Sequence, residues 1–157
     1  MPNTVLPFSL GQASTSGVYA NLLGQEFVDC TSANGPRTFV VVKLAAALAA
    51  PARKVVVSAI SGGFATFVVN TTTTAGVGPG YVIPAEYTST IPIDSYILAQ
   101  VKGPAEVLSA AAVAAFALVG TSTTAGKADD ATITGAAIGY ATEAAAGADE
   151  NMGVMLR

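Results

Sequence analysis

Apolar residues along the chain gather in short runs that Gly, Pro, Asn and Thr separate. β-branched residues dominate these runs, and such runs between turn residues are typical of strands. The firmest candidates are residues 26–30, 37–43, 54–60, 64–70 and 95–102, followed by 105–109, 116–119, 136–143 and 153–156. Gly62-Gly63 between two of these runs predicts a hairpin. The pattern predicts a mainly β fold, a small antiparallel barrel or sandwich with little helix.

Three segments between these strands are less regular. Residues 44–50 could start a short helix, which Pro51 would end. Residues 71–80 are predicted as a loop. Residues 81–84 and 86–92 end in Pro84 and Pro92, which would place them at a sheet edge or in a connection.

The small apolar residues from Tyr96 to Gly120 fit a helix, a membrane span or strands. A helix would have to pass through Gly103-Pro104, where an interior proline costs about 3 kcal/mol. The run 107–120 is shorter than the roughly 20 residues that a bilayer requires. We therefore expect two strands flanking a tight corner at Gly103-Pro104 in a protein that does not enter a membrane. A short helical turn at 110–115 stays open, because alanine is the best helix former.

The first 25 residues show no sustained period, yet they contain many apolar side chains. We interpret residues 1–25 as an extended N-terminal arm and residues 26–157 as a β-rich barrel or sandwich domain. The arm could dock on another protein, or it could supply the first strand of its own sheet. Phe8, Leu10, Tyr19 and Leu22 are the candidate capsid or oligomer contacts, with ordinary core packing as the alternative for them.

Composition predicts that other molecules cover part of the surface. Hydrophobic residues make up 52% of the chain and charged residues only 11%, against about 25% charged in an ordinary soluble domain. A surface with so few charges is poorly protected against association. The net charge of −3 and the absence of a cluster of cations argue against direct nucleic-acid binding. The N-terminus lacks the basic and apolar regions of a secretory signal.

The residue types available for catalysis are few. Cys30 is the single cysteine and the chain has no histidine, so neither a zinc site nor a Cys-His pair is expected, and Cys30 is predicted to be a buried structural thiol. Asp129-Asp130 and Asp149-Glu150 lie in predicted loops without the alternating ligand pattern of a calcium loop. A Ser or Thr paired with Lys54 or Lys102 lies in no recognisable motif. We expect no enzyme, no metal and no cofactor.

Several motifs resemble those of the decoration, or cement, proteins of tailed double-stranded DNA bacteriophages. These motifs are SYILAQVKGPA at 95–105, VGTSTTAGK at 119–127, AIGYATE at 137–143 and MGVML at 152–156. GPRTFVVVK at 35–43 is similar to the early strand of such proteins. The N-terminal 30 residues contribute nothing to the resemblance.

The resemblance implies a protein that binds the outer surface of the assembled head and bridges subunits of the major capsid protein. Such proteins are commonly trimers, so a homo-oligomer on the virion surface, made in the host cytoplasm, is the implied state. If residues 1–25 are a capsid-binding arm, deleting residues 1–16 should leave a folded domain that no longer protects capsids. The alternative is a secreted or surface-displayed bacterial β module, such as an adhesin or fibre subunit.

Overall fold

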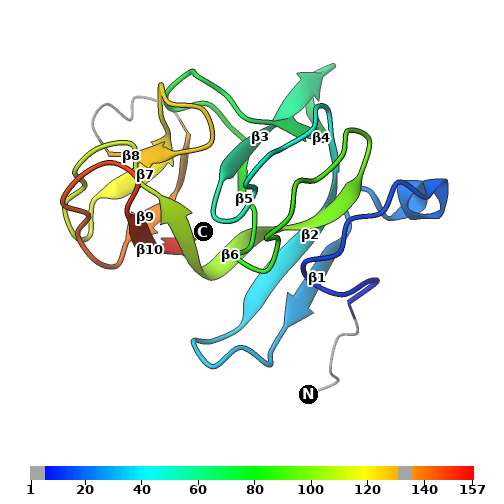
Figure 1. The fold of residues 1–157 in the computed structure, drawn as a ribbon, viewed down its shortest axis with the longest axis horizontal. Coiled ribbons are helices and arrows are strands. Elements are labelled where there is room, and N and C mark those ends of the chain that lie inside the picture. The colour runs from blue at the N-terminus through cyan, green and yellow to red at the C-terminus, as the bar shows by residue number, and fades with distance from the viewer. Residues whose placement is uncertain (1–5, 131–135) are drawn as a thin grey trace.

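The structure is a computed structural model that describes residues 6–130 and 136–157, and its regular elements are almost all β-strands (Figure 1). The strands are β1 (Glu26–Asp29), β2 (Arg37–Leu44), β3 (Val55–Ser61), β4 (Phe64–Asn70), β5 (Gly80–Val82), β6 (Tyr96–Leu108), β7 (Leu118–Thr121), β8 (Ala128–Asp129), β9 (Ala137–Ala141) and β10 (Asn151–Leu156). One 3-10 helix, η1 (Gly17–Leu22), precedes them. The prediction of a mainly β fold with little helix is confirmed.

Five strands close into a barrel in the order β2-β4-β3-β5-β6, with β6 pairing back onto β2. All of these pairings are antiparallel except that of β2 with β4, which is parallel. β1 pairs with the first half of β2. Closure leaves these strands without a free edge over their paired lengths.

Strand β6 is 13 residues long and belongs to two sheets. It pairs with β2 as far as Lys102, and from Gly103 to Leu108 it pairs with β10. The prediction of two strands separated by a corner is therefore wrong, because the strand runs through Gly103-Pro104 without a break. Gly103 has φ of +90°, and a Cβ there would lie 2.3 Å from the carbonyl oxygen of Pro36. Glycine allows the bend and the close approach that a break would otherwise supply.

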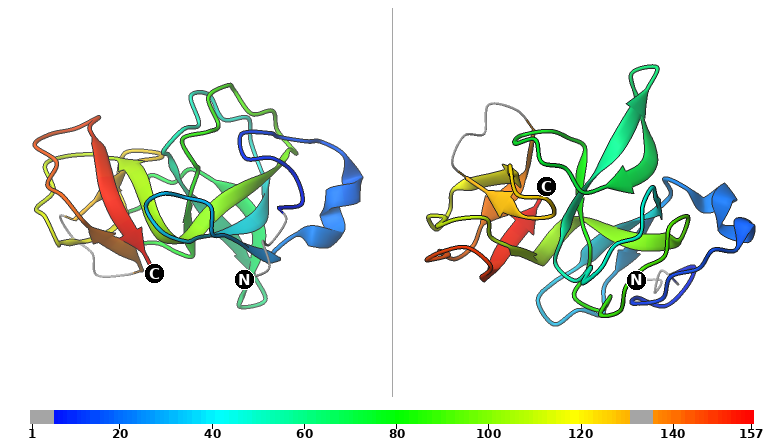
Figure 2. Two further views of the ribbon diagram at one scale, coloured as in Figure 1. Left: turned by 90° about the horizontal axis from the view of Figure 1, so that it is seen from below. Right: turned by 45° about the horizontal axis from the view of Figure 1, so that its top comes forward.

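The second sheet has the order β6-β10-β9-β7-β8 and curls around its own core. Just after β6, Ser109 forms an isolated parallel bridge with Ala128 of β8, so the last strand returns to the first. The molecule thus has two lobes joined by β6 (Figures 1 and 2). We call them the barrel and the C-terminal lobe.

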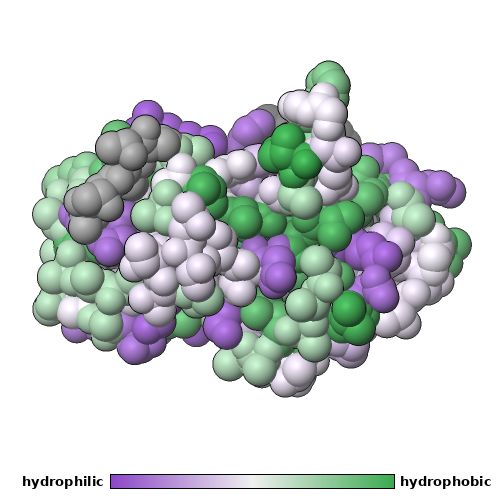
Figure 3. Space-filling view, turned by 90° about the horizontal axis from the view of Figure 1, so that it is seen from above, coloured by the Kyte–Doolittle hydropathy of each residue, from purple (hydrophilic) through white to green (hydrophobic). Residues whose placement is uncertain are grey.

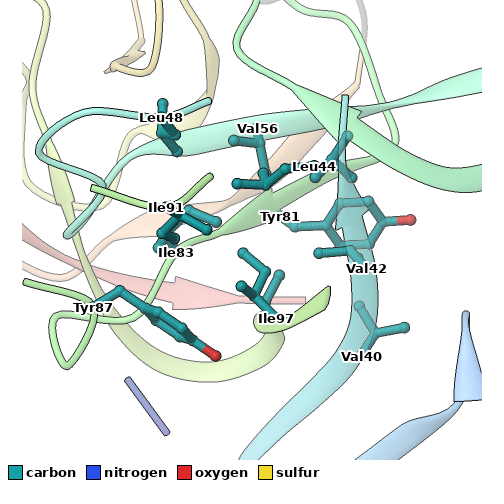
Figure 4. Packing of buried hydrophobic residues seen from close by; sticks show 12 residues of the cluster. Val40, Val42, Leu44, Leu48, Val56, Tyr81, Ile83, Tyr87, Ile91 and Ile97 are labelled. Carbon is teal, nitrogen blue, oxygen red and sulfur yellow. The ribbon is translucent and has the colours of Figure 1, made fainter. Parts of the chain in front are cut away.

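A separate buried cluster fills each lobe, and the cluster of the C-terminal lobe also includes Val55 and Val82 from the barrel strands β3 and β5. Side chains from opposite walls of the barrel meet in its interior, among them Leu44, Val56 and Ile97 (Figure 4). The C-terminal lobe packs around smaller residues such as Val119, Ala141 and Met152. Of the alanine-rich sequence between β6 and β10, only Ala128, Ala141 and Ala145 are buried among the described residues, and most of the other alanines there are exposed.

The two short helices left open by the sequence are not formed. Leu48 pairs with Ile91 and Val113 pairs with Ala145, each in an isolated bridge. In both segments the backbone bonds to a distant part of the chain, and this overrides the helical preference of alanine.

Two local predictions need correction. Tyr81 and Val82 belong to β5, which pairs with β3 and β6 and is therefore not an edge strand, whereas residues 86–92 lie in the connection between β5 and β6, as one of the two alternatives predicted. Cys30 is exposed, not buried. Asp29 points inward as the last residue of β1, so its neighbour Cys30 points outward.

Candidate binding surfaces

The four predicted contact residues lie against the chain's own barrel. Phe8, Leu10, Tyr19 and Leu22 are all partly buried and pack against Phe39, Val41, Tyr96 and Leu98 of β2 and β6. The rings of Phe8 and Tyr19 meet edge to face with centroids 4.9 Å apart. Contact with a capsid or a second copy therefore stays a prediction for these residues, and any such contact would have to use their exposed parts.

The alternation of side chains along β2 explains why the N-terminal residues must cover the outside of the barrel. Val40 and Val42 point into the barrel, whereas Phe39 and Val41 point outward and are still fully buried. A strand buried on both faces has the continuous apolar run seen in β2. Residues 6–25 form the outer layer, and Ser14 holds them in place with two backbone bonds to Tyr96.

A groove of about 470 Å³ lies beside the part of β6 that changes partner. Its walls come from both lobes, with Val82 and Pro84 on the barrel side and Gly153 and Val154 on the C-terminal side. Gln100 is 2% exposed, and its amide nitrogen donates to the carbonyl oxygens of Lys102 and Pro104.

The two arginines that line this groove form ion pairs with nearby carboxylates. Arg37 bridges Asp29 and Glu86 with N–O distances of 3.1 and 3.0 Å. Arg53 pairs with Glu106 at 2.6 Å. The Thr31 hydroxyl, which donates to Asp29, lowers the pKa of that carboxyl below its usual value, and Arg37 lowers it further. These pairs join residues up to 53 positions apart, so no local pattern could have predicted them.

A third surface consists of large apolar side chains that stay in solvent. Phe64, at the tip of the β3–β4 hairpin, is 79% exposed, and Ile60 is 53% exposed. Phe116 and Leu118 are 77% and 49% exposed on the C-terminal lobe. Val18 on η1 is 73% exposed. The Gly62-Gly63 turn predicted the hairpin, but nothing in the sequence distinguished its apolar residues from those of the core.

The residues considered for chemistry have other partners. The Lys54 ammonium donates to the carbonyl oxygen of Ala49, and Lys102 pairs with Glu26 at 3.5 Å. Asp149 pairs with Lys127 at 2.7 Å. Among residues 6–130 and 136–157, no group of three or more acidic or cysteine side chains is placed to hold a metal ion. The same residues contain no helix that is long and apolar enough to cross a membrane.

Comparison with known proteins gives one structural likeness. No family model and no curated protein matches the sequence. The fold is similar to the crystal structure of the N base of head fiber gp8.5 in bacteriophage phi29, with a TM-score of 0.52 and 8% sequence identity. The alignment covers 77% of this chain and 94% of that one. At this identity the likeness shows that the two chains share a fold.

Proposed function

We propose that this chain is a structural protein of a bacteriophage head, held on the outer capsid surface where it bridges subunits of the major capsid protein. The observation that carries the proposal is the fold shared with the base of a phage head fiber. The motifs in β2, β6, β9 and β10 that resemble phage decoration proteins support it independently, because they come from the sequence and not from the fold. No catalytic step or cofactor belongs to the proposal.

The surface is consistent with a protein that works by contact. Charged residues are 11% of the chain, and several large apolar side chains on separate parts of the molecule are exposed. Contacts of this kind are weak one by one. A homo-oligomer, with a trimer favoured, would engage several capsid subunits at once and gain affinity through effective concentration.

The sequence left open whether the N-terminal segment docks on another protein or on its own domain, and residues 6–25 pack against the chain's own barrel. Leu6, Phe8 and Leu10 cover the outer face of the barrel, so deleting residues 1–16 would uncover Phe39 and Tyr96 as well as remove a contact. Loss of capsid binding after that deletion would therefore not identify the segment as an arm. Val18→Ser is the cleaner variant, because Val18 is exposed on η1 and its loss uncovers nothing.

The test is co-sedimentation of the purified protein with capsids of the phage whose genome encodes it, prepared without the protein. We expect saturable binding, and a higher melting temperature of the capsids when the protein is bound. A protein that stays in the supernatant at every concentration would contradict the proposal. Recovery from the outer surface of bacterial cells, in place of virions, would favour the alternative of a surface-displayed β module.

A further inference from the structure

The outer half of the β3–β4 hairpin stands away from the barrel (Figures 1 and 2). β3 pairs with β5 only over Val55 to Val57, and β4 pairs with β2 only at Val68 and Val69. Beyond these points, among the described residues, the two strands are paired in the ladder only with each other, from Ile60 to Ala65. Because no neighbouring strand covers this part, it is free to meet another molecule.

Side-chain hydrogen bonds hold the hairpin in one conformation. The backbone N–H of Phe67 donates to Ser58 Oγ at 2.9 Å, across a bulge between Ser58 and Ile60. Thr66 Oγ1 donates to the carbonyl oxygen of Ala59 at 3.0 Å. Gly62 and Gly63 both have positive φ, which the favoured two-residue hairpin turns require. A rigid element loses little conformational freedom when it binds.

Both faces of this hairpin carry an exposed apolar side chain. Phe64 is 79% exposed and lies opposite Ser61, whereas Ile60 is 53% exposed and lies opposite Ala65. Successive positions along a strand point to opposite faces, so Phe64 and Ile60 point away from each other. A flat partner would bury one of them and leave the other in water. A cleft would bury both.

The absence of charged side chains limits which kind of partner surface the hairpin can bind. Residues 55–85 contain no Asp, Glu, Lys or Arg. In Figure 3 the hairpin is the part that projects at the top right of the molecule, and its surface is green and white. Such an element has no charge to pair with a phosphate backbone or with a charged protein surface. It fits a cleft whose two walls are apolar, where a buried aromatic side chain supplies most of the contact energy.

We propose that the hairpin tip is a wedge that inserts Phe64 and Ile60 into an uncharged, apolar cleft on another protein of the particle. This inference rests on the proposed function, and it specifies which part of the surface makes the contact. Truncating a residue that dominates an interface typically weakens binding by about 30-fold or more.

The test compares Phe64→Ser, Ile60→Ser and Phe116→Ser with the unchanged protein in the capsid co-sedimentation assay. Phe116 is the matched control, because it is 77% exposed and lies on the C-terminal lobe. We expect about 30-fold weaker binding for Phe64→Ser, a clear loss for Ile60→Ser, and no change for Phe116→Ser. All three variants should melt at the same temperature as the unchanged protein, since the replaced side chains are exposed.

The possible failures are distinguishable. If the unchanged protein does not bind capsids, the proposed function fails, and the wedge fails with it. If it binds and Phe64→Ser binds equally well, only the wedge is overturned. If Ile60→Ser binds normally while Phe64→Ser does not, the cleft is replaced by a flat contact.

Two other occupants are tested in the same preparations. If sedimentation shows that the unchanged protein self-associates and that Phe64→Ser is monomeric, the cleft belongs to a second copy, which overturns the proposal. Flotation with phosphatidylcholine vesicles that depends on Phe64 would overturn it in favour of a membrane.

Discussion

Replacing Tyr87 by Phe tests how the closed barrel is held together. Tyr87 is 1% exposed, and its hydroxyl accepts a hydrogen bond of 2.9 Å from the backbone N–H of Leu98 in β6. The variant keeps the ring, so no large cavity forms, but it leaves a buried N–H without a partner. That loss costs about 1–3 kcal/mol. In a domain of this size each kcal/mol corresponds to about 2–4 °C in Tm.

Urea denaturation followed by circular dichroism measures this change. We expect a lower midpoint with an unchanged m-value, because the surface exposed on unfolding stays the same. Tyr140→Phe is the control, since Tyr140 is only partly buried on β9, and it should alter the free energy of unfolding by less than about 0.5 kcal/mol. Equal stabilities of Tyr87→Phe and Tyr140→Phe would refute the reasoning that the bond to Leu98 contributes to the barrel.

The same variant makes a prediction about alkaline pH. Burial raises the pKa of Tyr87 well above its usual value of 10.0, so the folded state resists ionisation. The unfolded state ionises near pH 10, and the free energy of unfolding therefore falls as the pH rises above that value. Tyr87→Phe should show a shallower alkaline decline than the unchanged protein. Parallel declines would contradict the burial of an un-ionised hydroxyl.

Two further changes test the β6 bend and the Arg37 pairs. Gly103→Ala places a Cβ 2.3 Å from the Pro36 carbonyl oxygen at φ of +90°. Gly63→Ala is the control, because Gly63 has a similar φ of +85° but nothing near its Cβ position. The free energy of unfolding should fall by roughly 1–2 kcal/mol from positive φ alone in Gly63→Ala, and by clearly more in Gly103→Ala. Equal losses in thermal melts would show that the close approach is unimportant. Asp29 has a lowered pKa, so its contribution to stability is present above the usual carboxyl value of 3.8 and is lost as the pH falls below it. Asp29→Asn should be less stable than the unchanged protein at neutral pH, and its Tm should fall less steeply as the pH is lowered. An equal fall of Tm in both proteins would contradict a stabilising role of the Asp29 carboxylate.

The sequence predicts strands well where apolar runs are bounded by turn residues. β2, β3 and β4 appear close to their expected positions, because β-branched residues flanked by glycine leave few alternatives. β8 was not predicted, since two residues carry no detectable period. The continuity of β6 was missed for another reason. Gly103-Pro104 resembles a turn locally, and only the approach of Pro36 shows that the glycine serves a bend inside a strand.

The surfaces are harder to predict because they depend on register. The run Phe39 to Val42 indicates a strand that is buried on both faces, but no local pattern says which segment covers the outer one. The same limit applies to Phe64 and Phe8. Both are aromatic residues near glycines, yet one is exposed at a tip and the other packs against Tyr19.

The apolar composition has three internal uses before any partner is considered. The barrel interior, the C-terminal lobe and the outer face beneath residues 6–25 each need a separate apolar cluster. Composition alone therefore overstates how much of the surface requires cover. The remaining exposed side chains, such as Val18 on η1 and Phe64 on the β3–β4 hairpin, lie on different elements. Under the proposed function, Phe64 supplies the main contact of each copy, and an oligomer would gain affinity by engaging several such copies at once.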